Sequence, residues 1–287
     1  MPMKLQDGAL RRQASRRGIC VQGFTLVELV MVIALAGVVA VMVGTVMSRP
    51  LQGFADHRLR AELTDLAATA LNRMARDIRL AVPSSVVVAD AGDEIRLIPI
   101  AAAGRYRANQ PDPAGPRQDP PVCTQPSGAS CAIDILSPIE PADSKDNKHW
   151  LIIYNTGSLV GRPEAVDGAV SPISPKAFTW KNGVLKADLW SFRFEFASPQ
   201  HRFFLADRVI GYRCQAGALV RAEFDELDGS DYSRAAKVVD HVDCSRSRFA
   251  YDTSTHTRNG VVTLKLVLAN DGGAITLLQQ VQVDNAP

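Results

Sequence analysis

The sequence predicts an α+β protein in which a long N-terminal helix packs on an antiparallel β-sheet. Three observations predict this class: an apolar run at residues 24–47, a helical repeat of apolar residues after Pro50, and short alternating segments separated by turn residues later in the chain. The length of 287 residues, the 46% hydrophobic content and the net charge of +2 fit one globular region plus one membrane segment.

The apolar run at residues 24–47 contains a single charged residue, Glu28. The run is long enough to cross a bilayer as a helix, which needs roughly 20 apolar residues. A carboxylate within lipid costs about 2.5–3.5 kcal/mol on insertion scales. An ordinary single-pass anchor gains nothing from Glu28, whereas a helix that later leaves the lipid and packs among copies of itself can pair it.

The residues before the apolar run are basic, with one acid, Asp7, against Lys4, Arg11, Arg12, Arg16 and Arg17. Because a basic flank stays in the cytoplasm, the C-terminal part is expected outside the inner membrane. Loss of residues 1–23 removes five bases and one acid, which takes the net charge from +2 to −2. The net charge therefore gives no support to nucleic-acid binding.

Two other interpretations of this segment are an unprocessed anchor and an ordinary secretory signal. Ala34-Leu35-Ala36 offers a small-residue cleavage site of the secretory type. The apolar run continues well past Ala36, however, and Glu28 would interrupt the short apolar core of such a signal.

Gly23-Phe24-Thr25-Leu26-Val27-Glu28 resembles the cleavage and methylation signature of type IV prepilins and type II secretion pseudopilins. The resemblance implies that a prepilin peptidase cuts between Gly23 and Phe24 and that the new amino group of Phe24 is N-methylated. It also implies that Glu28 faces the Phe24 ammonium of a neighbouring subunit and sets the assembly register. Two such charges about 4 Å apart attract by roughly 4 kcal/mol at an effective dielectric of 20.

The helix is expected to continue as an amphipathic segment over residues 48–82. Steps of three and four residues define its apolar face, and Pro50, with Gly44 and Gly53 nearby, is expected to kink or loosen it. Pro83 is expected to end it, because the residue before proline avoids the helical region. The apolar positions are Leu59, Leu63, Leu66, Ala70, Met74, Ile78 and Ala81.

Residues 83–287 are expected to form one β-rich globular domain on the outer side of the membrane. Short strands are predicted at 94–98, 150–154, 190–196 and 202–206, and hairpins at 209–221 and 261–283. The second hairpin turns at Asn270-Asp271-Gly272-Gly273, a strong turn signal. Phe192, Phe194, Phe196, Phe203 and Phe204 are expected in the core of the sheet rather than in a ligand site.

Residues 104–147 contain eight prolines and little apolar periodicity, which predicts a long loop without regular pairing. Of the five cysteines, Cys20 lies in the leader and four remain in the domain. An even number in an oxidising compartment indicates disulfides. Three pairings are possible, and we favour the chain-local one, Cys123–Cys131 with Cys214–Cys244.

Within the prepilin group, the chain resembles MshO-type minor pilins of the mannose-sensitive haemagglutinin (MSHA) class of type IV pilus. The similar segments are residues 49–54, 73–79, 200–205, 212–214 and 282–287. This resemblance implies a minor pilin that acts in pilus assembly, priming or surface adhesion. It implies other pilins, an inner-membrane platform protein, an assembly ATPase and the prepilin peptidase as partners, and a final location on the cell surface.

Three other functions were weighed. A minor pseudopilin of a type II secretion system has the same N-terminal signature, and a fibre-borne adhesin module would use the loop at 104–147. An enzyme has poor support, because no catalytic motif is present and His57, His149, His201, His241 and His256 are scattered. No cofactor is predicted, and Asp225, Asp228 and Asp231 form only a weak calcium candidate whose spacing does not match an EF-hand.

Overall fold

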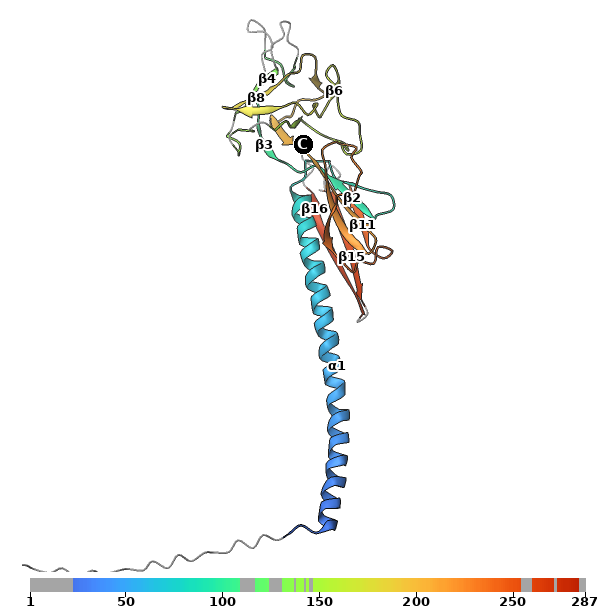
Figure 1. The fold of residues 1–287 in the computed structure, drawn as a ribbon. Helices are drawn as coiled ribbons and strands as arrows, with labels where there is room; N and C mark the ends of the chain where they lie inside the picture. The colour runs from blue at the N-terminus through green and yellow to red at the C-terminus, as the bar shows by residue number, and fades with distance from the viewer. Residues whose placement is uncertain are drawn as a thin grey trace, which may run out of the picture. The chain divides into compact units, whose positions relative to one another are not determined.

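The computed structural model describes residues 23–108, 117–123, 131–136, 138–141, 143–144, 147–253, 260–270 and 273–283. The chain divides into two compact units, Met1–Ala55 and Asp56–Pro287, which are described separately below. Helix α1 (Leu26–Arg79) belongs to both units, and the strands all lie in the second (Figure 1).

Helix α1 continues through Pro50 and ends at Arg79, three residues before the end expected from Pro83. Arg76 and Arg79 lie in its last turn, where cations favour the negative end of the helix dipole. The Leu80 N–H still bonds to the Arg76 carbonyl at 3.2 Å, and the chain then turns into the sheet region.

In the second unit, α1 buries one face against two antiparallel sheets. The expected apolar face is partly wrong, because Leu59 and Leu66 are 38% and 40% exposed. The stripe instead passes through Ala67 and Leu71, which continue the i, i+4 row from Leu63. The buried helix residues are Leu63, Ala67, Ala70, Leu71, Met74, Ala75 and Ile78.

The first of these sheets has five strands in the order β1-β2-β11-β12-β13. Its central hairpin turns at Ala216 and Gly217, which both have positive φ, and this confirms the hairpin predicted at 209–221. The strands are β1 (Val87–Val88), β2 (Glu94–Leu97), β11 (Val209–Gln215), β12 (Ala218–Phe224) and β13 (Ala236–Val239).

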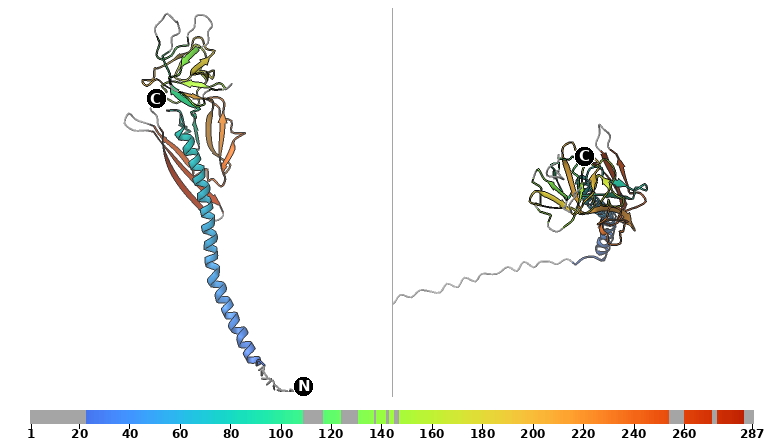
Figure 2. Two further views of the ribbon diagram at one scale, coloured as in Figure 1. Left: turned by 90° about the vertical axis from the view of Figure 1, so that its left-hand side faces the viewer. Right: turned by 90° about the horizontal axis from the view of Figure 1, so that it is seen from above.

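The second sheet has the order β14-β15-β16, from β14 (Arg248–Asp252), β15 (Gly260–Asn270) and β16 (Gly273–Val283). It contains the predicted hairpin at 261–283, whose two long strands pair in one unbroken register. Figures 1 and 2 show β15 and β16 lying along the second half of α1. Leu264, Leu266 and Val281 of this sheet share one core with the helix stripe.

The remainder of the second unit forms smaller sheets around a separate core. One sheet has the order β3-β10-β5 and another the order β4-β8-β7, while β6 and β9 form a parallel pair. Phe178, Trp180, Phe192 and Phe203 fill the core between them. These strands are β3 (Ala102–Arg105), β4 (Cys131–Asp134), β5 (Trp150–Ile152), β6 (Val170–Ser171), β7 (Thr179–Lys181), β8 (Val184–Ala187), β9 (Arg193–Phe194) and β10 (Arg202–Ala206).

The expectation of an unpaired loop at 104–147 is wrong for β4 and for the end of β3, whereas the described residues 138–141 and 143–144 form no strand. All four residues of β4 pair with β8 in an antiparallel ladder, and Tyr106 forms an isolated β-bridge with Ile135. β4 has only four residues, so its alternation of buried and exposed side chains is too short to stand out among the surrounding prolines. Residues 109–116, 124–130, 137, 142 and 145–146 lie outside the described residues.

The strand predicted at 190–196 is also mostly wrong. Only Arg193 and Phe194 form a strand, and Trp190 and Phe196 are 70% and 49% exposed. The Asp167 carboxylate accepts the N–H groups of Trp190 and Ser191 at 3.1 Å, which holds this end of the segment in a loop. The predicted aromatic face is therefore split, with Phe192, Phe194 and Phe203 in the core.

Candidate functional site

The N-terminal segment begins with three residues outside α1. Gly23 has open space around its Cα, and Phe24 is 81% exposed, so the Gly23–Phe24 bond is accessible. Residues 1–22, which include Cys20, lie outside the described residues. The expected cleavage point therefore lies in the non-helical residues immediately before helix α1.

Thr25 caps the helix. Its Oγ1 accepts the Glu28 N–H at 3.3 Å, and its carbonyl accepts the Leu29 N–H at 3.1 Å. A Thr followed three residues later by Glu is a capping-box pattern, in which the side-chain oxygen satisfies an N–H of the first helical turn. Thr25 and Glu28 alone carry this signal, so the start of the helix was predictable from these two residues.

Glu28 lies in the first turn of α1 and is exposed. Within the described part of the chain, its carboxylate has no hydrogen-bond or ion-pair partner. Helix polarity favours a negative charge at this end, but it leaves the carboxylate oxygens open to a further donor. Glu28 can thus cap its own helix through the backbone and pair with another chain through its side chain.

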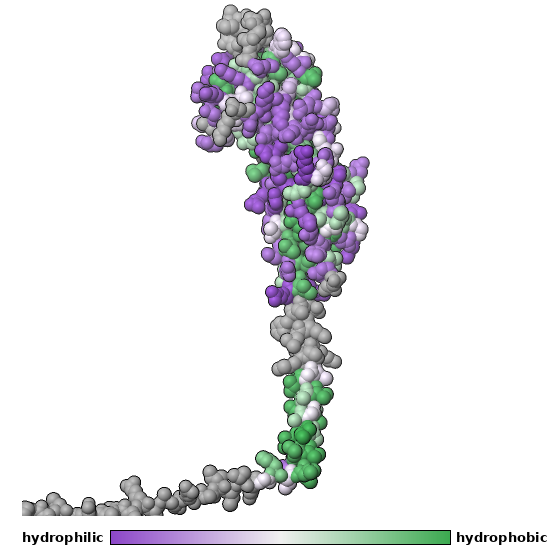
Figure 3. Space-filling view, in the orientation of Figure 1, coloured by the Kyte–Doolittle hydropathy of each residue, from purple (hydrophilic) through white to green (hydrophobic). Residues whose placement is uncertain are grey.

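Leu26–Val46 forms a candidate membrane span of 21 residues with a mean hydropathy of 2.8, and none of it is buried within the protein. Figure 3 shows its surface as almost continuously apolar. Large side chains are exposed all around it, as in Leu29, Ile33 and Met42. Such a helix is stable in lipid or against other apolar helices and not in water.

The family described as the prokaryotic N-terminal methylation motif matches residues 20–44. The N-terminal segment is pilin-like. Its match covers the glycine, the phenylalanine and the carboxylate discussed above, and supports a type IV pilin- or pseudopilin-like protein with a membrane anchor. The motif implies processing by a prepilin peptidase and assembly with other pilins. No curated protein and no solved structure matched the chain.

The four cysteines of the second unit are joined in pairs, Cys123 to Cys131 and Cys214 to Cys244. The first pair lies in the core beside Phe192 and fastens the start of β4. The second connects β11 to the segment after β13, where Val242 bridges to Leu268 of β15. This disulfide therefore joins the two sheets that enclose the helix.

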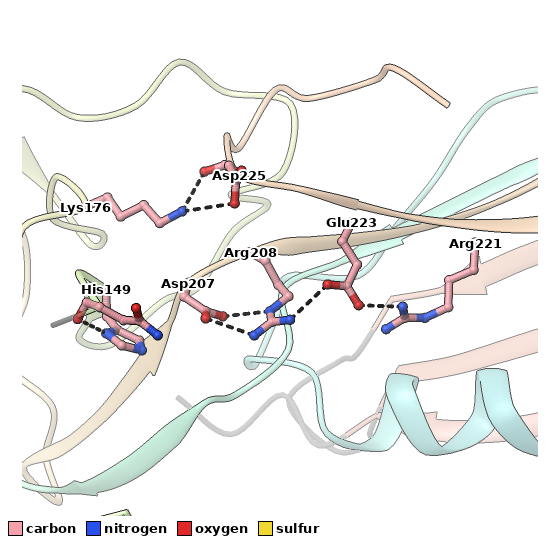
Figure 4. A network of polar contacts seen from close by, with 8 residues as sticks. His149, Lys176, Asp207, Arg208, Arg221, Glu223 and Asp225 are labelled. Carbon is pink, nitrogen blue, oxygen red and sulfur yellow. Dashed lines mark hydrogen bonds and ion pairs between the residues drawn. The ribbon is translucent and has the colours of Figure 1, made fainter. Parts of the chain in front are cut away.

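A network of alternating charges runs from the connection between β10 and β11 to strand β12 (Figure 4). Arg208 donates to Asp207 at 2.9 Å and to Glu223 at 2.9 Å, and Glu223 also accepts from Arg221 at 2.6 Å. The hydrogen bond from Arg221, assisted by that from Arg208, holds the pKa of Glu223 below its usual value.

The charge network reaches α1 at Asp77. Asp77 accepts the Tyr212 hydroxyl at 2.6 Å and the Arg221 Nε at 3.1 Å. Burial and the bond to Asp77 raise the pKa of Tyr212 above its usual value, so it remains a donor at physiological pH. This cluster was not predictable from the sequence, because Tyr212 and Arg221 are 135 and 144 residues away from Asp77 along the chain.

His149 lies beside Asp207, at the end of the charge network opposite to Arg221 (Figure 4). It is buried, donates Nδ1–H to the Asn147 carbonyl at 2.9 Å and meets Trp180 edge-on. Burial lowers the pKa of His149, although the charge of Asp207 opposes the shift. His149 is therefore a buried, neutral side chain with a structural role.

A second missed cluster fastens the proline-rich segment. Asp119 accepts the Tyr106 hydroxyl at 2.8 Å and lies 3.0 Å from the His201 Nε2. The Tyr106 oxygen in turn accepts the Ser198 N–H at 3.1 Å. These bonds connect the segment at 117–123 to the turn before β10, and they have a structural role.

The weak calcium candidate is not assembled. Asp225 is turned to the Lys176 ammonium at 3.7 Å, and Asp231 caps Ser233 through its backbone N–H and hydroxyl at 2.8 and 2.9 Å. In the described ranges, no three His, Cys, Asp or Glu side chains are grouped to hold a metal.

Proposed function

We propose that the protein is a minor pilin-like subunit that is cleaved after Gly23, methylated on Phe24 and added to a type IV pilus of the MSHA kind. The observation that carries the proposal is the combination in one segment of an accessible Gly23–Phe24 bond, a Glu28 carboxylate without a partner among the described residues, and an apolar span exposed on all sides. A permanent lipid anchor needs the span and has no use for the other two.

In this proposal, residues 1–23 are a cytoplasmic leader and residues 24–47 are the polymerisation helix. The segment at 48–82 connects that helix to the domain at 83–287, which is delivered to the outer side of the inner membrane. The Phe24 ammonium of one subunit neutralises the Glu28 carboxylate of its neighbour. Because neither charge is stable alone in lipid, the pair favours one axial register.

The second candidate is a minor pseudopilin of a type II secretion system, which the same motif favours equally. The resemblance of short segments to MshO-type minor pilins favours the pilus. The two candidates differ in where the processed protein is found, because a pilus leaves the cell and a secretion pseudopilus stays in the envelope.

Mass spectrometry of surface fibres sheared from native cells tests the proposal. The expected result is a peptide that begins with N-methylated Phe24. Processed protein found only in the membrane fraction would support the pseudopilin instead.

A Gly23→Ala variant tests the cleavage point. Cleavage is expected to fail in this variant, so that the precursor mass persists, while Gln22→Ala serves as the control. A normal mature mass in the Gly23 variant would contradict the assigned cleavage point.

A further inference from the structure

Strand β16 is an edge strand with unusual properties. It pairs with β15 on one side, and in the described part of the chain no strand lies on its other side. It is 11 residues long and keeps register with β15 without a bulge. Typical strands have about five or six residues.

Native proteins protect such edges with charges, prolines, bulges or short length. The described strands at other sheet edges follow this rule, since they have two to five residues and several carry a charge, such as Arg105 in β3, Lys181 in β7 and Lys237 in β13. Residues 273–283 contain no charged residue and no proline. The longest edge is therefore the one without protection.

The register shows which backbone groups face outward. Asn270 pairs with Gly273 across the two-residue turn, and such a closing pair is hydrogen-bonded in a tight hairpin. Because bonded and non-bonded pairs alternate in an antiparallel ladder, every second residue of β16 turns its N–H and C=O away from β15. These residues are Ala274, Thr276, Leu278, Gln280 and Gln282.

The same five residues have exposed side chains, whereas Ile275, Leu277, Val281 and Val283 face the core with α1. Leu278 is 61% exposed. The edge thus offers five donors and five acceptors, with one apolar side chain at its centre. An extended polypeptide strand matches groups at this spacing, because its own N–H and C=O groups alternate with the same repeat.

We propose that β16 pairs with a strand of a different pilin-like subunit, so that the sheet continues across the subunit boundary. Two copies of this chain that joined like edges would form a two-fold, antiparallel pair. Since β16 lies along α1 (Figures 1 and 2), that pair would direct the Asp56–Arg79 segments of the two copies oppositely. Subunits anchored in one membrane by their N-terminal ends need these segments to point the same way. The inference rests on the proposed function.

Photocrosslinking in the native cells tests the proposal. A photoreactive phenylalanine analogue replaces Leu278 in one variant and Leu80 in the control variant. Both leucines are 61% exposed, but the Leu80 backbone is already bonded, with its N–H to Arg76 and its carbonyl to Ile100. The expected adduct forms from position 278 and not from position 80, and its partner has its own N-terminal methylation motif.

A second pair of variants tests the backbone directly. Gln280→Pro removes an outward N–H and leaves the β15 ladder intact, because proline is tolerated where an edge N–H faces away from the sheet. Gln280→Ala changes the side chain alone. Relative to Gln280→Ala, the proline variant is expected to show normal processing and membrane level but roughly tenfold less protein in the fibre fraction.

The outcomes separate the two proposals. Uncleaved precursor in every variant would refute the proposed function and with it the inference. Normal cleavage with equal fibre levels for the two Gln280 variants would overturn the inference alone. So would an adduct between two copies of this chain, an adduct with a protein that lacks the motif, equal adducts from positions 80 and 278, or processed protein without an adduct at 278.

Discussion

Asp77 on helix α1 accepts hydrogen bonds from both Tyr212 on β11 and Arg221 on β12. The side chains of Arg221 and Asp77 are 15% and 22% exposed, so the ion pair is shielded from water on most sides. The bonds lie at the edge of the core that the helix shares with the five-stranded sheet. This relationship fixes both the rotation and the height of the helix segment against the sheet, which apolar packing alone defines less sharply.

Replacement of Asp77 by Ala is expected to lower the free energy of unfolding by about 2–3 kcal/mol. The reason is that two donors, one of them charged, lose their acceptor in a half-buried position. Chemical denaturation of the purified protein in detergent measures this loss. Asp65→Ala is the matched control, because Asp65 is exposed on the same helix and such changes cost about 0.5 kcal/mol or less. Equal effects of the two changes would show that the cluster has no stabilising role.

The two disulfides are expected to differ in their contribution to stability. Cys214–Cys244 closes 30 residues and Cys123–Cys131 closes 8. In the chain-entropy model these loops correspond to about 3.6 and 2.5 kcal/mol. Paired Cys→Ser variants, compared by their urea midpoints, should therefore show the larger loss for the Cys214–Cys244 pair. A larger loss for the shorter loop would mean that its burial beside Phe192, and not loop length, sets its contribution.

Local signals in the sequence account for much of the fold. The hairpin of β15 and β16 and most of the apolar repeat along α1 depend on neighbours within a few residues, and the structure contains the pairing of Asn270 with Gly273 and the buried positions from Leu63 to Ile78. The pilin-like segment is predictable for the same reason, since Gly23, Phe24 and Glu28 lie within six consecutive residues. The Thr25 cap belongs to this class and was overlooked.

Contacts between distant parts of the chain were not predictable in this way. Four residues from Cys131 to Asp134 become a strand only because β8, about 50 residues later, supplies a partner. Trp190 belongs to a segment whose apolar and polar residues alternate as in a strand, but its backbone N–H bonds to the Asp167 carboxylate and not to a neighbouring strand. The Asp77 cluster joins one helix residue to two strands, and nothing in the residues near Asp77 indicates either partner.

His149 gives the folded domain a pH dependence of known sign. Its pKa is lowered in the folded state by burial, while the unfolded chain has the usual value of about 6.5. Below that pH the unfolded chain binds a proton that the folded protein does not, so stability falls as the pH drops through 6.5 toward the folded pKa. Between pH 7.5 and 5.5 the uptake of this one proton by the unfolded chain can lower the stability by no more than about 1.4 kcal/mol.

The loss assigned to His149 is measured as the slope of unfolding free energy against pH. His149→Phe should flatten the slope in this window, whereas His57→Gln should not, because His57 is exposed on α1. Asp207 and Glu223 have lowered pKa values in the folded state. Their contributions to stability are therefore lost only at more acidic pH, outside the window in which His149 is measured. An unchanged slope in His149→Phe would assign the pH dependence to other groups.

Substitution of Glu28 can separate the effect of its charge from that of a polar side chain. Gln is also found at this position of a capping box, so Glu28→Gln should preserve the start of the helix while removing the charge. Glu28→Val removes the charge and the polar side chain, and both variants keep the backbone N–H that bonds to Thr25. If pairing with the Phe24 ammonium of a neighbour sets the register, both variants should be cleaved normally after Gly23 and both should be depleted from the fibre fraction, by roughly tenfold or more for a pair that is desolvated on assembly. Quantitative mass spectrometry of the Phe24 peptide in membrane and fibre fractions measures cleavage and incorporation together. Depletion of the Val variant with normal incorporation of the Gln variant would instead show that assembly needs a polar side chain at position 28 and not its charge.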